Sequence, residues 1–265
     1  MFRLLYPFIL LLKKSKNLSA LSCRLTKLTG KSKHPLHPKH LVVVEKPWYI
    51  THIKSWDFVL DLGCGNGQHT LKAAKKCKKI IGLDYDSGNL RIGCKIAQER
   101  QIKNVQFRKL NLEKNLPFKK NVFDKILCLD ILEHLLKRKK LLLEMKRVLK
   151  PGGLLFISVP NKNTSWKRLQ RRVGLNAYSD PDHKKEYSFK EVKSFLKQAS
   201  FKIISLKPVT YDTPWAGFID LIGGISLKWY KKLSLWNKNK VKDSLDESTG
   251  FRIKSRPFPY SEKSN

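Results

Sequence analysis

Short apolar runs, which predict buried strands, alternate along the middle of the chain with longer segments whose apolar residues recur every three or four positions, which predict amphipathic helices. The expected strands are residues 58–62, 79–84, 105–110, 123–129, 154–159 and 201–209. The expected helices are residues 69–78, 87–101, 135–149 and 188–199. A capping-box sequence, with Ser188 followed three residues later by Glu191, marks the start of the last helix. Strands joined by crossover helices predict an α/β protein with a mostly parallel sheet covered on both faces.

Residues 1–44 form a basic segment whose apolar residues predict an amphipathic helical arm. Residues 4–12 are mostly apolar but too few to span a membrane, and Pro7 interrupts them. The leucines that follow are spaced three or four residues apart and predict one apolar side of a helix: Leu18, Leu21, Leu25 and Leu28. The cations Lys16, Arg24 and Lys27 fall elsewhere on this helix, and Gly30 offers a stop. Two interpretations stay open: a helix that lies on an anionic bilayer, or an arm that packs on its own domain.

Residues 212–249 are rich in aromatic side chains, namely Trp215, Phe218, Trp229, Tyr230 and Trp236. We expect Gly223-Gly224 to act as a hinge and residues 250–254 to form a last strand, so that the aromatic stretch is an insertion before it. Such aromatics could form a lid over an apolar acceptor or rest at a membrane interface, and plain core packing explains them equally well. The predicted domain plan is an arm at 1–44, a core at 45–211, the insertion or lid at 212–249, and the last strand with a tail at 250–265.

The net charge of +34, from 55 Lys and Arg against 21 Asp and Glu, bears on the partners of the protein. A charge of this size favours contact with polyanions, either nucleic acid or an anionic membrane surface. Lys is spread along the whole chain, however, and a lysine-rich background composition gives the same distribution. A hydrophobic content of 41% excludes a disordered basic tail. The oligomeric state is not indicated.

The five Cys residues indicate the kind of cellular compartment in which the protein resides. Their odd number and the lack of a C-x-x-C pair argue against a disulfide scaffold or a Cys-rich zinc site. We therefore expect a reduced, cytoplasmic protein, which the membrane interpretation would place peripherally at the inner face of the membrane.

A glycine-rich turn, Gly63-Cys64-Gly65-Asn66-Gly67, follows the first strand, and Asp84 ends the second. Glycines let the backbone approach a ligand closely, and the helix after them directs its N-terminal amides to the same place. A carboxylate at the end of the next strand can accept two hydrogen bonds from a ribose diol. The spacing is G-x-G-x-G, which differs from the dinucleotide motif, and no phosphate-binding G-K-S/T loop occurs. The layout predicts a nucleotide-binding site.

Residues 59–67, VLDLGCGNG, closely resemble the first signature of class I S-adenosylmethionine-dependent methyltransferases. Four further stretches resemble later motifs of this family in the same order: residues 80–86, 110–118, 123–135 and 148–161. The resemblance covers about residues 45–211. It implies a Rossmann-like, doubly wound sheet of seven strands with helices on both faces, here with an added N-terminal helical arm, and S-adenosyl-L-methionine as cofactor.

By this resemblance, the glycine turn and Asp61 surround the methionine part of the cofactor, through Gly63, Gly65 and Gly67. Asp84 would hold the ribose hydroxyls, and Tyr85 would pack against the adenine. Asn111 stands where the family usually carries Asp, and its side-chain oxygen can still accept a hydrogen bond from the adenine amine. The resemblance also places Cys64, Leu112 and Leu129 beside the cofactor.

Asp130, Glu133 and His134 follow the fourth strand, at the ligand-binding end of such a sheet. His134 is the preferred general base because an imidazole titrates near neutral pH, and Asp130 is the second catalytic candidate. An alternative is that His134 begins a helix and has no chemical role. The D-I-L-E-H string also resembles ubiquinone-pathway O-methyltransferases, where acids and a His here could hold a divalent ion, but we assign no metal ligand. His183 occupies a position that in related methyltransferases approaches the acceptor pocket, but we interpret it as a surface residue in a charged loop.

The first functional hypothesis is methyl transfer to a small or lipid-like acceptor, at oxygen. The alternative is an RNA methyltransferase, motivated by the net charge. Against it, the fourth motif lacks the Asp/Asn-Pro-Pro-Phe/Tyr sequence that grips base amines, and no Pro-Cys dipeptide is present. A third hypothesis is a non-catalytic interaction protein that keeps the cofactor pocket.

Overall fold

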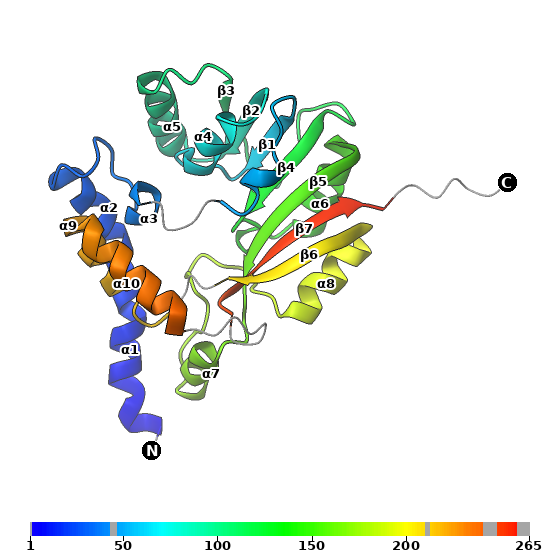
Figure 1. Ribbon diagram of the computed structural model, residues 1–265. Coiled ribbons are helices and arrows are strands. Elements are labelled where there is room, and N and C mark those ends of the chain that lie inside the picture. The colour runs from blue at the N-terminus through cyan, green and yellow to red at the C-terminus, as the bar shows by residue number, and fades with distance from the viewer. Residues whose placement is uncertain (1, 43–46, 210–212, 241–247, 259–265) are drawn as a thin grey trace. The chain divides into compact units, whose positions relative to one another are not determined.

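The computed structural model describes residues 2–42, 47–209, 213–240 and 248–258 (Figure 1). The chain divides into two compact units, each built from three separate stretches. The helical unit comprises Met1–Lys46, Asn161–Pro181 and Pro208–Gly250, and the sheet unit comprises Pro47–Pro160, Asp182–Lys207 and Phe251–Asn265.

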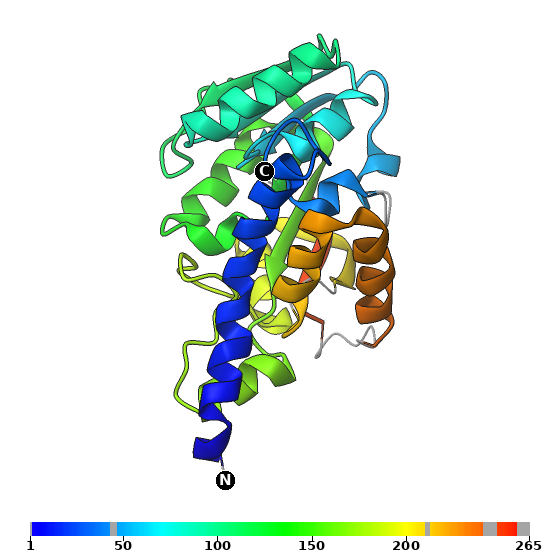
Figure 2. The ribbon, with the colours of Figure 1, turned by 90° about the vertical axis from the view of Figure 1, so that its left-hand side faces the viewer.

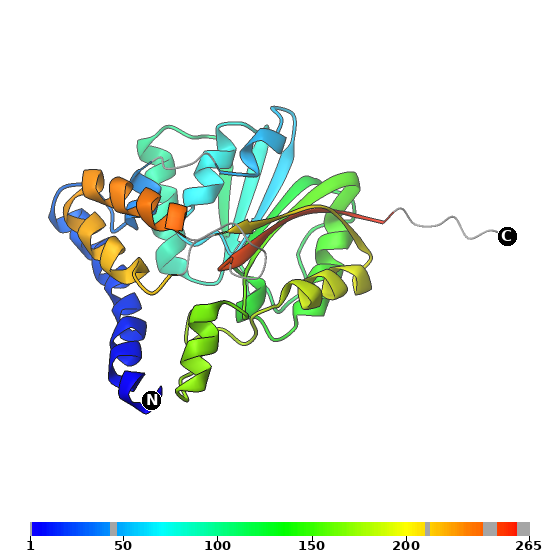
Figure 3. The ribbon, with the colours of Figure 1, turned by 60° about the horizontal axis from the view of Figure 1, so that its bottom comes forward.

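The sheet unit contains a seven-stranded sheet with the order β3-β2-β1-β4-β5-β7-β6. Its strands are β1 Phe58–Leu62, β2 Lys79–Asp84, β3 Val105–Lys109, β4 Phe123–Leu129, β5 Leu149–Pro160, β6 Phe201–Val209 and β7 Gly250–Pro257. Its helices are α4 Gln68–Ala74, α5 Ser87–Glu99, α6 Arg138–Val148 and α8 Phe189–Gln198. The pairs β3–β2, β2–β1, β1–β4 and β4–β5 are parallel. The predicted Rossmann-like, mostly parallel α/β fold is confirmed, as the twisted sheet in Figure 3 shows.

Alternate residues of the central strands pack in two separate cores, which is why these strands are mostly apolar. Leu60 of β1 packs in a core with residues of α6 and α8, whereas its neighbour Val59 packs with Ala73 of α4. In β5, Leu155 belongs to the first core and Phe156 to the second. A strand buried on both faces has no polar side, so its sequence reads as a continuous apolar run.

Element ends differ from the predictions by a few residues where local geometry overrides the pattern. β5 begins at Leu149, because Pro151-Gly152-Gly153 lies within the strand instead of preceding it. α6 begins only at Arg138, since Leu132–His134 forms a separate 3-10 helix. The predicted capping box of α8 is present: Ser188 Oγ accepts from the Glu191 amide at 3.2 Å, and Glu191 Oε2 accepts from the Ser188 amide at 2.8 Å.

The helical unit joins the N-terminal arm to the aromatic insertion. Its helices are α1 Tyr6–Lys14, α2 Leu18–Leu28, α3 Pro38–Leu41, α7 Ser165–Arg172, α9 Ala216–Ile225 and α10 Leu227–Lys240, with 3-10 helices at Phe2–Leu5 and Ser15–Asn17. Figure 2 shows α1 and α2 following one another along nearly one line, with α9 beside α2. The domain plan predicted from the sequence has the arm and the insertion as separate regions and includes residues 161–181 in the core. In the structure all three stretches belong to the helical unit.

Gly223 and Gly224 lie inside α9 and are buried, so the predicted hinge is wrong. A Cβ at Gly223 would come within 2.6 Å of the Tyr230 ring and 2.7 Å of Pro38 Cβ. A Cβ at Gly224 would come within 2.7 Å of Leu25 Cβ. The two glycines are needed because α9 approaches its neighbours too closely for any side chain.

We expect Gly223→Ala to destabilise the helical unit by about 1–3 kcal/mol, the usual cost of overpacking. Helix propensity alone favours the opposite sign, because Ala stabilises a helix interior relative to Gly by roughly 0.5–1 kcal/mol. Chemical denaturation of the full chain measures the difference. A net gain in stability would contradict the close approach.

Helix α2 packs within the unit through its small polar side and Leu25, and not through Leu21 and Leu28. Ser22 and Thr26 are fully buried, whereas Leu21 and Leu28 are 43% and 79% exposed. The helix itself, and its stop at Gly30 with a φ of 68°, are as predicted. Over the parts of the chain that the structure describes, no helix has the length and apolar character needed to cross a membrane.

Candidate functional site

The glycine turn after β1 adopts a left-handed backbone at Gly63, Gly65 and Gly67. At Gly63 a side chain is excluded, because a Cβ would lie 1.9 Å from Ile131 Cδ1. At Gly65 a Cβ would meet no atom within 4 Å. The turn is therefore packed against protein at Gly63 and open at Gly65, which leaves room for a ligand to approach the backbone there.

Asp84 is held in place by the backbone around it. Its Oδ2 accepts from the Gly65 amide at 2.7 Å, and its Oδ1 accepts from the Asp86 amide at 2.9 Å. The side chain thus joins the end of β2 to the glycine turn. Each carboxylate oxygen keeps a further lone pair, so Asp84 can still accept hydrogen bonds from a ligand diol.

Asp61 is buried at the end of β1, and Thr70 Oγ1 donates to its Oδ2 at 2.6 Å. Burial raises the pKa of this carboxyl to about 7, which the Thr70 hydrogen bond opposes and the charge of Asp84 reinforces. Burial also raises the pKa of the nearby Cys64 thiol well above its usual range. Cys64 is therefore no nucleophile, and Asp61 is poised to change charge near neutral pH.

We expect the affinity for a cationic ligand at Asp61 to fall as the pH decreases through about 7. A bound ammonium favours the carboxylate, so binding at this pH releases a proton. In the free protein the raised pKa of Asp61 means that ionisation of this carboxyl destabilises the fold. The free energy of unfolding therefore decreases as the pH rises towards 7. Calorimetry in two buffers of different ionisation enthalpy counts the released protons. The variant Asp61→Asn should abolish this release, and its persistence would assign the titration to another group.

The remaining predicted cofactor residues lie on the loops after β2 and β3 and at the last position of β4. The Tyr85 ring is 75% exposed, so it is available to pack against a planar ligand. Asn111 Oδ1 already accepts from the Glu113 amide at 2.9 Å, which leaves one lone pair for an adenine amine. Leu112 is buried and Leu129 is half-buried.

Gln68, the first residue of α4, was not singled out from the sequence. Its side chain is buried, and its Nε2 has no hydrogen-bond partner. An unpaired buried donor costs about 1–3 kcal/mol, which a ligand acceptor would offset. The only signal in the sequence was its position directly after the glycine turn.

Asp130 follows β4 in a left-handed conformation with a φ of 57°. Its Oδ1 accepts from Ser158 Oγ of β5 at 2.8 Å, and its amide donates to the Ser158 carbonyl at 3.0 Å. These bonds hold the exposed carboxylate at the carboxyl ends of two adjacent parallel strands.

His134 ends the 3-10 helix Leu132–His134, and its ring meets the ring of His183 edge to face, with centroids 4.6 Å apart. His183 Nδ1 lies 2.9 Å from Glu186 Oε1. The Glu133 carbonyl accepts from the amides of Lys184 and Lys185 at 2.7 and 3.1 Å, which fixes the loop that carries His183. The interpretation of His183 as a surface residue is wrong, because its side chain is only 7% exposed.

Glu133, His134 and His183 offer ligand atoms that all lie within 4.8 Å of one another. Two imidazoles and a carboxylate are a donor set that suits zinc, manganese or ferrous iron. Glu186 is placed to orient the His183 ring, as carboxylates commonly do behind metal-bound histidines. These residues fit a divalent cation.

The sequence model of a methyltransferase-domain family matches residues 53–213, which is more than half of the chain. The chain belongs to this family. Its methyl donor is S-adenosyl-L-methionine, in agreement with the predicted cofactor and with the glycine turn and acidic strand end described above.

Individual relatives of this methyltransferase are distant. A ubiquinone biosynthesis O-methyltransferase of Acinetobacter baumannii is 29% identical over 105 residues, which are 40% of this chain and 44% of that protein. A probable S-adenosylmethionine-dependent methyltransferase of Mycolicibacterium smegmatis is 29% identical over 166 residues, 62% of this chain and 58% of that protein. The methyltransferase thus matches about half the length of these relatives.

Among solved structures, an S-adenosylmethionine-dependent methyltransferase of Methanosarcina mazei superimposes with a TM-score of 0.57 at 19% identity. The superposition covers 81% of this chain and 98% of the other. At this identity it supports the fold alone.

Proposed function

We propose that this methyltransferase transfers the methyl group of S-adenosylmethionine to a hydroxyl oxygen of a small or lipid-like acceptor. The observation that carries the proposal is the contact of His134, which follows β4, with the ring of His183, whose Nδ1 lies 2.9 Å from Glu186 Oε1. A hydroxyl must lose its proton to become a good nucleophile, and an imidazole nitrogen of this cluster can accept that proton as a general base.

In the proposed site the glycine turn and Asp84 bind the cofactor, and Asp61 and Gln68 face its methionine part. The acceptor oxygen attacks the methyl carbon in line as the carbon–sulfur bond breaks, and the electron pair of that bond stays on the sulfur. A ring nitrogen of His134 takes the hydroxyl proton. Orientation of the two reactants can supply roughly 7–11 kcal/mol of the barrier in favourable cases.

The same cluster supports a second role for His134. Bound to Glu133, His134 and His183, a divalent cation would lower the pKa of an acceptor hydroxyl. In that case His134 holds the ion instead of the proton, and Glu186 orients His183. The two roles predict different effects of the His183→Asn variant on enzymatic activity.

The acceptor class rests on two further observations. The relatives named as ubiquinone biosynthesis O-methyltransferases favour a small, apolar acceptor methylated at oxygen. The net charge of +34 keeps RNA as the competing acceptor, although the fourth motif ends in Leu-Asp-Ile-Leu-Glu instead of the sequence that grips base amines.

The test is incubation of the purified full chain with S-adenosylmethionine carrying a labelled methyl group. Parallel reactions receive lipid and quinone extracts, total RNA, or neither. We expect label in an organic-phase product that is stable to mild base, as a methyl ether is. Label in RNA alone would favour the alternative, and cofactor binding without transfer to any acceptor would overturn the enzymatic proposal.

A further inference from the structure

A stripe of large apolar side chains follows the outer side of the helices at the N-terminal end of the chain. It consists of Leu4, Phe8, Leu11, Leu21 and Leu28, which are 83%, 53%, 59%, 43% and 79% exposed. Leu18 and Leu25, half-buried, fall between them at the same three- and four-residue spacing. We call these five exposed residues the leucine stripe.

Packing inside the helical unit uses the other side of these helices. Ile9 and Leu12 of α1 are buried, as are Ser22 and Thr26 of α2. Thr26 Oγ1 donates to the Leu36 carbonyl at 2.7 Å. Helix α2 thus buries small polar groups fully and leaves Leu21 and Leu28 outside, whereas an amphipathic helix of a globular protein usually turns its apolar side to the core.

The neighbouring pair of helices, α9 and α10, also exposes large apolar groups. Trp215, Trp229 and Trp236 are 47%, 54% and 47% exposed, and Ile225 is 60% exposed. Single exposed apolar residues are common, but contiguous groups of them mark an interaction surface. Trp in particular favours the boundary between water and lipid.

The exposed charges of these helices have one sign. Residues 1–42 contain nine Lys and Arg and no Asp or Glu. The one acidic residue of α9 and α10 is Asp220, which is buried, accepts a hydrogen bond from Ser19 and pairs with His37 Nε2 at 3.1 Å. The cations that surround the apolar groups therefore meet no exposed acid on α1, α2, α9 or α10.

We propose that the helical unit docks on an anionic lipid bilayer through the leucine stripe, with the surrounding lysines and arginines against the lipid headgroups. Apolar side chains bordered by cations are the composition of helices that lie in a membrane interface. A second copy of the chain fits this surface poorly, because it would bring the cations of both copies together.

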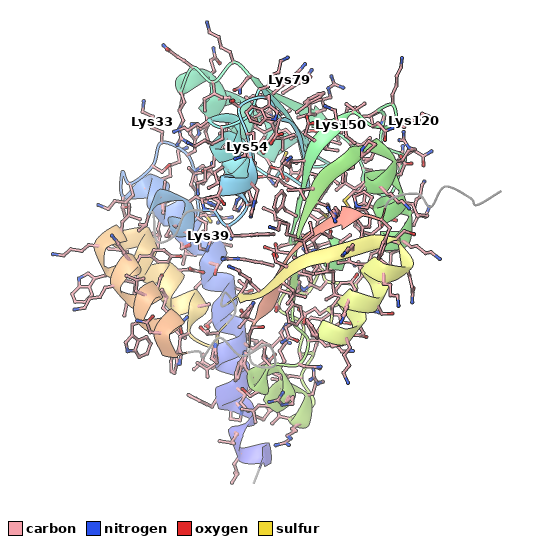
Figure 4. All side chains as sticks on the ribbon, turned by 45° about the vertical axis from the view of Figure 1, so that its right-hand side comes forward. Lys33, Lys39, Lys54, Lys79, Lys120 and Lys150 are labelled. Atoms are coloured by element: carbon pink, nitrogen blue, oxygen red, sulfur yellow. The ribbon has the colours of Figure 1, made fainter. Side chains whose placement is uncertain are left out.

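Charge alone does not carry this proposal, since both units are basic. Among the lysines labelled in Figure 4, Lys33 and Lys39 belong to the helical unit, whereas Lys54 and Lys150 belong to the sheet unit. The distinguishing observation is that the exposed apolar stripe and the acid-free helices coincide in the helical unit.

The test is sedimentation of the full chain with vesicles of phosphatidylcholine alone and of phosphatidylcholine with 30% phosphatidylglycerol. The double variant Leu21→Gln/Leu28→Gln changes no charge and no buried group. We expect it to bind the anionic vesicles about tenfold more weakly or worse, because it loses apolar burial in the lipid. Leu143→Gln, which alters a leucine of the sheet unit that is 49% exposed, should bind as the natural chain does.

Equal binding by both variants and the natural chain would overturn the proposal, since the attachment would then be electrostatic only. Absence of vesicle binding, with a concentration-dependent dimer that the double variant abolishes, would assign the stripe to self-association and also overturn it. Neither measurement involves methyl transfer, so their outcome is independent of the proposed function.

Discussion

Replacing Asp84 by Asn should weaken the binding of S-adenosylmethionine roughly 100-fold, the effect of losing about 3 kcal/mol of charge-assisted hydrogen bonding. The carboxylate has two tasks in the structure. It fixes the glycine turn through the Gly65 amide at 2.7 Å, and it is the proposed acceptor for the ribose diol. An amide of the same size keeps one uncharged acceptor oxygen in place of two that share a negative charge, so it accepts fewer and weaker hydrogen bonds.

Asp86→Asn is the matched control for this measurement. Asp86 lies two residues away and accepts from the amides of Gly88 and Asn89 at the start of α5. Its replacement should change stability slightly and leave cofactor affinity within about twofold, because it has no bond to the glycine turn. Calorimetric titration gives both affinities. If both variants bound S-adenosylmethionine equally weakly, the loss of affinity would come from a general destabilisation of the loop after β2.

The second large effect is expected at His134. His134→Gln should lower kcat by roughly 100- to 10,000-fold, the usual worth of a positioned general base, without changing the affinity for the cofactor. Circular dichroism and cofactor titration check that the variant folds and binds. His52→Gln is the control, because His52 stacks on Phe156 in the same unit but lies outside the cluster.

His183→Asn separates the two roles of His134. If His134 is the base, this variant should keep most of the activity, and the rate of the natural enzyme should rise with pH as an imidazole loses its proton. If both histidines hold a cation, both variants should lose activity, and a chelator should inactivate the natural enzyme until manganese or zinc is restored. If the rate does not rise with pH and a chelator does not inactivate the enzyme, His134 has no chemical role.

Much of the fold could be predicted from the sequence because its strongest signals are local. The strands β1, β2, β4 and β6 have the predicted bounds. β1, β2 and β4 contain short apolar runs, whereas the apolar residues of β6 are interrupted by Lys202, Ser205 and Lys207. The glycine turn was predictable for the same reason: only glycine readily takes three left-handed positions within five residues.

The errors concern contacts between segments that lie far apart in the sequence. Gly223-Gly224 is typical of a hinge, and only the presence of Leu25 and Pro38 against α9 shows that the pair is a packing site. His183 lies in a charged loop, and its burial depends on the ring of His134, about fifty residues earlier. The apolar periodicity of α2 identified a helix correctly, but periodicity alone could not tell which side of it is buried.

The strand order has a consequence for how the protein is made. β7 lies between β5 and β6 in the sheet, although both of these strands are synthesised before it. Until it arrives, β5 and β6 cannot be joined through it and their edges stay open to pairing with other chains. Completion of the sheet therefore waits until β7 has been made, and loss of β7 would interrupt the sheet internally instead of removing an edge strand.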